Sequence, residues 1–377
     1  MSLFLLCLYV MIVMTVINGN QYVAGLSFVG LPTLALVGAS LFVKKEKLLS
    51  WNSILVALLI LFAFLSTNLN LSVSKFNNFI NLAVSGFTFV IVSNARFSND
   101  VFKRVITFYA RFGLAICCIL IFNYLFGIGI RVFNESNIRV SIQYFGITKD
   151  INYLSSFILP SFGVYFYKGL FTGKSKLLVA AGIIFVAIFL GGSRSCFLPM
   201  MFVCILMVWK FLKDRNKKNK GLIILLLVVA AVVITYVMVN SSIFSRTINF
   251  ENYTDNARLR IWGFAMEGFY RSPFIGSGIS SGTYYAQQHV RWVTHSCYVD
   301  MLTSQGIIGT LIIIAITSEM FKVNKKNKMF NVSMLMLFFI PLAFIDGYVC
   351  ATFWMPMILC RILSKKAREN DDILVVL

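Results

Sequence analysis

The chain is a series of apolar runs long enough to cross a membrane, and one long polar segment late in the sequence interrupts the series. Crossing the hydrocarbon layer takes about 20 residues of α-helix. With 59% hydrophobic and 13% charged residues, this 377-residue chain does not have the composition of a water-soluble globule. The sequence therefore predicts an all-α polytopic integral membrane protein.

Roughly twelve such runs can be placed, within a range of about 10–14. They centre on residues 3–16, 22–43, 54–69, 79–92, 105–126, 153–167, 177–190, 197–212, 222–239, 298–317, 332–344 and 351–363. Two of them, 54–69 and 79–92, are short and polar at one end. The predicted organisation has transmembrane helices in 1–239, a large extracytoplasmic loop at 240–295, transmembrane helices in 296–363 and a cytoplasmic tail at 364–377.

Basic residues predict the orientation, because Lys and Arg in short loops favour the cytoplasmic side. If the N-terminus is inside, every second connection is basic. The six inside segments are 44–47, 96–104, 168–176, 210–220, 322–328 and 361–368. They hold 23 of the 34 Lys and Arg residues, and 18 of the 23 are lysine. Most of the +20 net charge is thus a topology signal and no nucleic-acid surface is expected.

The basic residues on the predicted outer side are mostly arginine, which favours phosphate recognition because its guanidinium is a rigid fork of donors. The positive-inside rule does not explain charges placed against it, so we expect an anionic group outside; solvated loop charges are the alternative. The outer set is Lys75, Arg131, Arg139, Lys149, Arg194, Arg246, Arg258, Arg260, Arg271 and Arg291.

Arg194 follows a tight Gly-Gly-Ser turn between two spans, and it is the one charged residue between Lys176 and Lys210. A charge at membrane depth is costly and is commonly functional. The alternative is that Arg194 extends its guanidinium to the lipid headgroups.

Residues 256–271 of the large loop predict an amphipathic helix in the outer membrane interface, ended by Ser272-Pro273. Its expected apolar face is Leu259, Trp262, Met266 and Phe269 or Tyr270. The helix is expected to hold Arg258 and Arg260 over the helical bundle. Glu267 is expected to form an ion pair with Arg260 or Arg271.

Gly276 and Gly278 follow this helix and allow close backbone approach. The loop also contains both histidines, His289 and His295. His295 lies where the chain returns into the membrane, and an imidazole there can act as a base near neutral pH. A hydrogen-bonded helix cap is the alternative role for His295, and His289 is expected to be structural.

These residues resemble the signature region of the bacterial O-antigen polymerase and O-antigen ligase superfamily. The turn around Arg194 is similar to a second motif of those proteins, and the plan of about 10–14 spans with one late periplasmic loop also matches. The resembling motifs are Arg258-x-Arg260-x-Trp262, Pro273-x-x-Gly276-x-Gly278, and His295-Ser296 followed after nine residues by Gly306-Ile307-Ile308-Gly309.

The resemblance implies a C-type glycosyltransferase bundle that works without a metal or other cofactor on a glycan carried by undecaprenyl diphosphate. In a polymerase, the growing chain passes to the non-reducing end of another lipid-linked repeat unit. The expected catalytic residues are His295, Arg258 and Arg260. The expected diphosphate-binding residues are Arg194, Arg258, Arg260 and Arg271. The expected supporting residues are Glu267, Tyr298, Asp300, Gly276 and Gly278, with Tyr298 and Asp300 orienting His295.

A polymerase, a ligase and a flippase are the three candidate functions. The ligase pattern of an arginine followed four residues later by leucine is absent, because Trp262 follows Arg258 and Phe264 follows Arg260. This favours a polymerase over a ligase that transfers the glycan to lipid A core. A repeat-unit flippase, a different class, would show repeat-like halves.

The expected partners are the lipid-linked oligosaccharide and membrane lipid, with a chain-length regulator and a flippase as further candidates. The expected location is the bacterial inner membrane, with both termini cytoplasmic and the active loop periplasmic or extracellular.

Overall fold

The structure is a computed structural model that describes most of the chain. The described residues are 2–18, 22–23, 26–27, 38–40, 43, 50–128, 130–132, 138–144, 147–148, 150–214, 221, 255–345, 347–349 and 351–377. The chain forms two compact units, one made of residues 1–109 with 255–377 and the other of residues 110–254. The division falls within one long helix, α5 (Asn99–Leu125).

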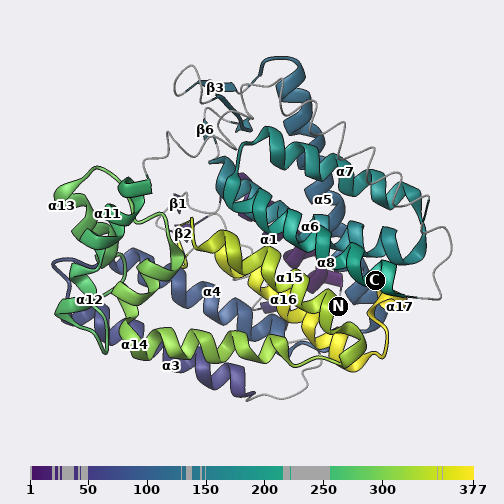
Figure 1. The fold of residues 1–377 in the computed structure, drawn as a ribbon. Helices are drawn as coiled ribbons and strands as arrows, with labels where there is room; N and C mark the ends of the chain where they lie inside the picture. The colour runs from purple at the N-terminus through teal and green to yellow at the C-terminus, as the bar shows by residue number, and fades with distance from the viewer. Residues whose placement is uncertain are drawn as a thin grey trace. The chain divides into compact units, whose positions relative to one another are not determined.

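The first unit is built from helices that come from both ends of the chain (Figure 1). Besides the start of α5, its α-helices are α1 (Ser2–Asn18), α3 (Trp51–Leu69), α4 (Phe76–Asn94), α11 (Asp255–Ala265), α12 (Glu267–Arg271), α13 (Ser281–His289), α14 (Cys297–Ser318), α15 (Lys328–Leu342), α16 (Ala351–Glu369) and α17 (Ile373–Val376). Two single-turn 3₁₀ helices, η1 (Glu319–Phe321) and η2 (Lys325–Asn327), connect α14 to α15.

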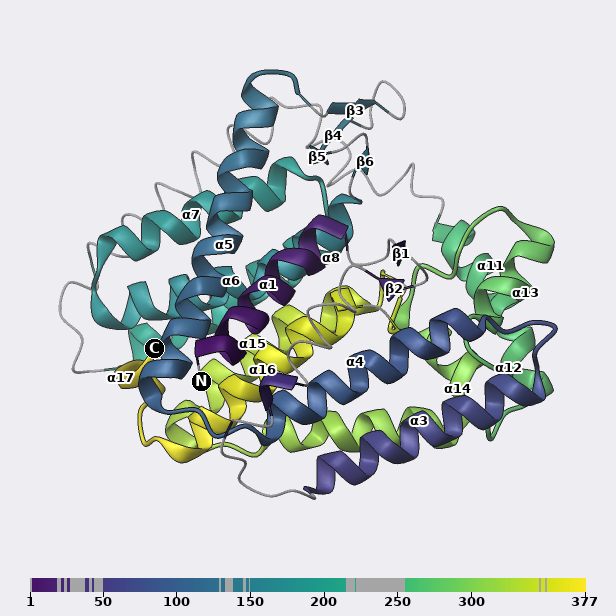
Figure 2. The same ribbon diagram turned by 180° about the vertical axis from the view of Figure 1, so that it is seen from behind.

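Packing in this unit places early and late helices side by side (Figure 2). α3 packs against α4 and α14, while α4 also packs against α16, which in turn contacts α15. Trp354 of α16 is buried with its ring 5.8 Å from that of Phe89 of α4. The short helices α11, α12 and α13 pack on one another and on the first part of α14.

The second unit contains the rest of α5 followed by α6 (Ile151–Thr172), α7 (Ser175–Leu190) and α8 (Arg194–Lys213). α6 packs against both α7 and α8. Two small antiparallel hairpins precede α6: β3 (Ile130–Val132) pairs with β4 (Ile138–Val140), and β5 (Gln143–Tyr144) pairs with β6 (Ile147–Thr148). Gly173, with φ of 70°, ends α6 and lets the chain turn into α7.

Five described helices are long and apolar enough to cross a membrane, judged by length and composition: α3, α4, α5, α8 and α14 extended to Phe321. Residues 3–16 of α1 and helix α7 are shorter apolar helices. The two runs that are short in the sequence, 54–69 and 79–92, lie in helices of 19 residues each, α3 and α4. The chain is therefore a helical membrane protein, and the number of about twelve spans stays a prediction.

The prediction of a membrane-spanning helix over 22–43 is wrong for its first residues. β1 (Tyr22–Val23) pairs with β2 (Leu26–Ser27) in an antiparallel hairpin, with Tyr22 opposite Ser27. Aromatic and β-branched residues favour such extended pairing over a helix start. Most of the remainder of this run lies outside the described residues, as do the run 222–239 and Arg246.

A break interrupts α14 at Gly306, whose φ of 62° and ψ of −165° are not helical. Such a conformation strains any residue with a side chain but not glycine. A break also leaves carbonyl groups before it and N–H groups after it without partners in the helix. The structure must satisfy these groups from another segment.

That segment is residues 272–280, which we call the strap. The N–H of Ser277 donates to the carbonyl of Thr303 at 2.9 Å, and the N–H of Gly278 donates to the carbonyl of Ser304 at 3.2 Å. Two carbonyls released before the break are thereby satisfied by the strap backbone.

The strap also accepts hydrogen bonds from α14 on the other side of the break. The N–H of Ile307 donates to the carbonyl of Pro273 at 2.8 Å, and the N–H of Ile308 donates to the carbonyl of Phe274 at 3.1 Å. The pairing is therefore reciprocal, and each segment satisfies the backbone that the other exposes.

The end of α3 forms a third part of this arrangement. The hydroxyl of Ser66 donates to the carbonyl of Ser304 at 2.9 Å and to that of Gly276 at 3.3 Å. Just beyond α3, the N–H of Lys75 donates to the carbonyl of Ile279 at 3.0 Å. Two segments more than 200 positions apart in the sequence, α3 and the strap, are thus held at one point of α14.

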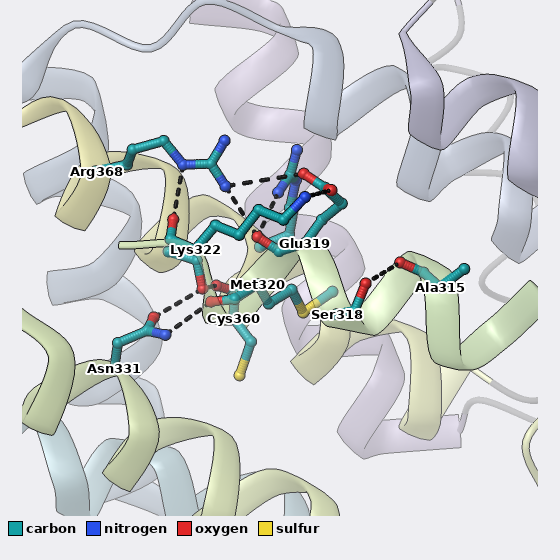
Figure 3. Close-up of polar contacts among 10 residues, drawn as sticks. Ala315, Ser318, Glu319, Met320, Lys322, Asn331, Cys360 and Arg368 are labelled. Carbon is teal, nitrogen blue, oxygen red and sulfur yellow. Dashed lines mark hydrogen bonds and ion pairs between the residues drawn. The ribbon is translucent and has the colours of Figure 1, made fainter. Parts of the chain in front are cut away.

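At its other end α14 leads into a charged cluster, in which Glu319 and Lys322 follow the helix and Arg368 comes from α16 (Figure 3). Arg368 donates to the carbonyls of Lys322 at 2.7 Å and of Glu319 at 2.9 Å, and its guanidinium lies 4.0 Å from the Glu319 carboxylate. The Lys322 ammonium pairs with the same carboxylate at 2.5 Å. Cations are favourable at a helix C-terminus because the last carbonyls carry negative partial charge.

The predicted tail, 364–377, is held against this end of the unit. Its first residues continue α16 to Glu369. Asn327 of η2 donates to the carbonyls of Ala367 and Asn370, both at 2.8 Å, and accepts from the N–H of Ile373 at 3.0 Å. The end of the chain is therefore packed rather than extended away from the helices.

We predict that Gly276→Ala and Gly306→Ala each lower the free energy of unfolding by about 2–4 kcal/mol. Both glycines have positive φ, at 79° and 62°. A Cβ on Gly276 would overlap the backbone of Ser304, and one on Gly306 would overlap the backbone of Phe274. The midpoint of thermal unfolding in detergent checks this.

Gly263→Ala is the matched control, because a Cβ there meets no atom within 4 Å. Alanine has the higher helix propensity, so this variant should unfold at the wild-type temperature or slightly above it. If Gly276→Ala and Gly306→Ala unfold at the same temperature as Gly263→Ala, the reciprocal pairing at the break is wrong.

Candidate functional site

The helix predicted over 256–271 exists as two helices, α11 and α12, that join at Met266. The side of α11 that packs on protein differs from the predicted apolar face, and the contact of that face with the membrane interface stays a prediction. Leu259 and Tyr270 are exposed by 60% and 73%, whereas Ile261 and Ala265 are buried. The buried stripe faces Ala286 of α13, so the packing of α11 against α13 decides which side of the helix is covered.

Trp262 fixes α11 to the chain segment that enters α14. Its indole N–H donates to the carbonyl of Thr294 at 2.8 Å, one residue before His295. A buried or half-buried tryptophan needs such a partner for its single donor. The Arg-x-Arg-x-Trp motif and the histidine are thus connected through this hydrogen bond.

Arg258 and Arg260 lie on different sides of α11, because residues two apart on a helix do not share a face. Arg258 is half-buried and its guanidinium carbon lies 5.5 Å from the centre of the Phe344 ring. Arg260 is exposed. The two arginines therefore differ in burial and start from different sides of the helix.

Arg271 ends α12, and its guanidinium carbon lies 5.1 Å from the centre of the Tyr285 ring of α13. Stacking on an aromatic ring stabilises arginine while leaving its N–H groups open to other partners. The side chain itself remains exposed.

The prediction that Glu267 pairs with Arg260 or Arg271 is wrong. Glu267 Oε1 lies 3.0 Å from Nε2 of His289, which comes from α13. The His289 ring also stacks on Phe264 with ring centres 4.2 Å apart. His289 therefore joins α12, α13 and α11, a structural role in agreement with expectation.

His295 has an unusual backbone, with φ of 49°. A non-glycine residue in the left-handed region costs about 1–2 kcal/mol, and such strain is concentrated at functional sites. Ser296 is the N-cap of α14, and its hydroxyl accepts from the N–H of Val299 at 3.4 Å. The cap is thus supplied by Ser296, and His295 precedes it with its ring 6.3 Å from that of Trp292.

Tyr298 is not directed at His295. Its hydroxyl donates to the carbonyl of Phe339 in α15 at 2.6 Å, and the side chain is 41% exposed. Tyr298 therefore links α14 to α15 and does not have its predicted role of orienting His295.

Asp300 is buried one helical turn before Ser304, on the same face of α14. Tyr348 interacts electrostatically with this carboxylate, and its hydroxyl accepts from Nε2 of Gln305 at 3.1 Å. Burial raises the pKa of the Tyr348 phenol, so the hydroxyl stays protonated and can donate. Within the described part of the chain, one carboxylate oxygen of Asp300 and the amide oxygen of Gln305 have no hydrogen-bond partner.

Residues 343–345 and 347–349 were not predicted as part of the site, although they bring Phe344 against Arg258 and Tyr348 beside Asp300. A polar interruption between two apolar runs was the available signal. Intramembrane polar residues are costly and commonly mark functional sites. In the part of the chain that is described, no group of three His, Cys, Asp or Glu side chains is placed to hold a metal ion.

Arg194 lies in the second unit, so its position relative to Arg258 and His295 stays a prediction. Gly192, with φ of 62°, precedes the N-cap Ser193, and Arg194 is the first residue of α8. A Cβ on Gly191 would lie 2.7 Å from Ile151, so the turn is as tight as the sequence predicts. An arginine and the positive end of a helix together favour an anion at this point.

A family model described as O-antigen ligase matches residues 179–314. The match begins in α7 and ends in α14, so it includes Arg194, helices α11 to α13 and His295. Residues 1–178 lie outside it, although the resemblance seen in the sequence extends over nearly the whole chain. No curated protein and no solved structure matches the chain.

The match supports the O-antigen polymerase and ligase superfamily, whose members are glycosyltransferase-like enzymes of polysaccharide assembly. It is compatible with a polymerase and with a ligase alike. For a membrane protein of this kind, lipid-linked glycans are the indicated class of substrate.

We predict that Tyr348→Phe lowers the free energy of unfolding by about 1–3 kcal/mol, because it strands the buried Gln305 amide. Tyr298→Phe is the matched control. It also removes one hydrogen bond, but at a partly exposed site, and should cost about 1 kcal/mol or less. Thermal unfolding in detergent compares them, and a larger loss for Tyr298→Phe would contradict the buried network.

Proposed function

We propose that this protein is an O-antigen or related polysaccharide polymerase, which joins oligosaccharide repeat units carried on undecaprenyl diphosphate at the outer face of the bacterial inner membrane. The observation that carries the proposal is the family match over residues 179–314, which contains the arginines and the histidine singled out by the sequence. The growing glycan is transferred to the non-reducing end of a new lipid-linked unit.

The reaction exchanges one bond at the anomeric carbon for another. The acceptor hydroxyl attacks that carbon, the bond to the diphosphate oxygen breaks, and undecaprenyl diphosphate leaves with the electron pair. Negative charge grows on the leaving group, and fixed arginines stabilise it more in the transition state than in the ground state. We assign this role to Arg194, Arg258 and Arg260, with Arg271 as a further diphosphate ligand.

His295 is the proposed base that takes the proton of the acceptor hydroxyl. Imidazole titrates near neutral pH and suits this task. The strained backbone of His295 supports the assignment, because a residue held at φ of 49° is costly without a purpose. The half-buried position of Arg258 on α11, linked through Trp262 to Thr294, supports its grouping with His295.

A ligase is the alternative that the family match supports equally. The sequence favours the polymerase only through the missing leucine four residues after each arginine, where Trp262 and Phe264 stand instead. A repeat-unit flippase, from a different class, does not account for the family match.

Surface glycolipid from cells that lack the gene, compared on a gel with complemented cells, separates the three functions. A polymerase deficiency should leave core that carries a single repeat unit. Bare core together with long lipid-linked polymer would show a ligase. Bare core with single lipid-linked units retained inside would show a flippase and remove the catalytic assignments.

Arg194→Ala, Arg258→Ala and Arg260→Ala should each lower polymer formation by about 100-fold or more while the protein stays in the membrane. Arg291→Ala is the matched control, since Arg291 is exposed in the same loop and has no proposed role; it should keep near wild-type polymer. Full activity in all three variants would contradict the diphosphate role.

His295→Asn is a sharper test of the base than His295→Ala. Asparagine tolerates the left-handed backbone better than most residues, so the chain conformation is preserved while the titratable group is lost. We expect normal membrane insertion, a rate lower by about 100-fold or more, and no remaining pH dependence near neutrality. A rate close to wild type would remove His295 from the mechanism.

A further inference from the structure

The depth of the strap follows from its attachment to α14. The charged cluster of Glu319, Lys322 and Arg368 marks one polar boundary of this helix (Figure 3). Gly306 precedes Ser318 by twelve residues, which corresponds to about 18 Å at the α-helical rise. A hydrocarbon layer is about 30 Å thick, so the break lies inside it.

Helix α3 gives an independent estimate of the depth of the strap in the membrane. Ser66, which holds both Ser304 and Gly276, comes fifteen residues after Trp51 at the helix start, or about 22 Å along the axis. α3 and α14 are both apolar enough to span a membrane. The lengths along α14 and α3 both place the strap about 18–22 Å from one boundary of the hydrocarbon layer and about 8–12 Å from the other.

Irregular backbone is tolerated at membrane depth only where protein or a water-filled cavity satisfies its polar groups. The strap meets this requirement. It pairs with four backbone groups around the break in α14, with the Ser66 hydroxyl and with the Lys75 N–H. The N–H of Gly276 also donates within the strap, to the carbonyl of Ser272 at 2.9 Å. None of the nine residues from 272 to 280 is charged.

One strap side chain is large, apolar and uncovered. Phe274 is 65% exposed, although its own carbonyl is bonded to Ile308 of α14. Beside it on α14, Ile307, Leu311 and Ile314 are exposed at helical spacing by 39%, 57% and 54%. Side chains three and four residues apart share a helix face, so this is one continuous apolar stripe. A stripe of this kind on a membrane helix faces lipid.

We propose that the strap is a re-entrant segment, inserted into the hydrocarbon layer from the side of the large loop, with Phe274 in contact with lipid hydrocarbon chains. The partner is the bilayer interior, because the exposed face of Phe274 continues the stripe of a membrane-spanning helix. The proposal places part of the predicted extracytoplasmic loop, 240–295, inside the membrane and does not depend on the transfer reaction.

Nitroxide accessibility measured in lipid nanodiscs tests the proposal. The label is attached to p-acetylphenylalanine at position 274, which keeps an aromatic ring there and avoids the eight native cysteines. Oxygen concentrates in hydrocarbon, whereas a nickel chelate stays in water, so the ratio of their collision rates reports depth. Leu311 provides the hydrocarbon reference, and Gln288, exposed on α13, provides the aqueous reference.

The expected result is a label at 274 that collides with oxygen and is protected from nickel, as at Leu311. A label that behaves as at Gln288 would show an aqueous loop and overturn the proposal. Protection from both reagents would show a protein partner on Phe274 and would also overturn it. If the 274 variant does not fold, a label at Ile307 measures the same depth, because its N–H is bonded to Pro273.

Discussion

The reciprocal backbone pairing between the strap and the break in α14 is the interaction on which the rest of the first unit depends. A helix interrupted at membrane depth exposes polar groups that cost several kcal/mol when they are left unsatisfied. The strap satisfies them, and Ser66 of α3 fastens both segments. Because α12 and α13 flank the strap directly, the same pairing fixes these helices and, through them, α11. Gly276 and Gly306 are required because only glycine permits the two backbones to approach so closely.

This arrangement explains how motifs that are far apart in the sequence come together in the structure. The arginine motif, the two strap glycines, the histidine and the glycines of α14 are separated by up to fifty residues, yet they form one packed group of short helices around the beginning of α14. Trp262 connects the first motif to the residue before His295, and α14 then holds the third motif at the break. A site assembled on a rigid group of helices can keep charged groups in place while the proposed substrate, a lipid-linked glycan, binds.

Much of the fold could be predicted from the sequence, since apolar runs of membrane length need few partners to become helices, as in α3, α5 and α8. The break at Gly306 could not, because its stability comes from a segment thirty residues earlier. The protein-facing side of α11 could not be predicted either, since Ala286 of α13 decides that Ala265 is covered and Leu259 is not. Glu267 was assigned a partner within its own helix, but the closer partner is His289 from α13. Each failure involves a tertiary contact that spacing alone does not encode.

The proposed activity of this chain is the formation of glycosidic bonds between lipid-linked repeat units. Its most direct test is the purified protein in nanodiscs, supplied with a single-repeat oligosaccharide on undecaprenyl diphosphate and no other acceptor. We expect a ladder of longer lipid-linked glycans, with one undecaprenyl diphosphate released for each glycosidic bond formed. Transfer that occurs only when lipid A core is added, or no transfer with either acceptor, would contradict it.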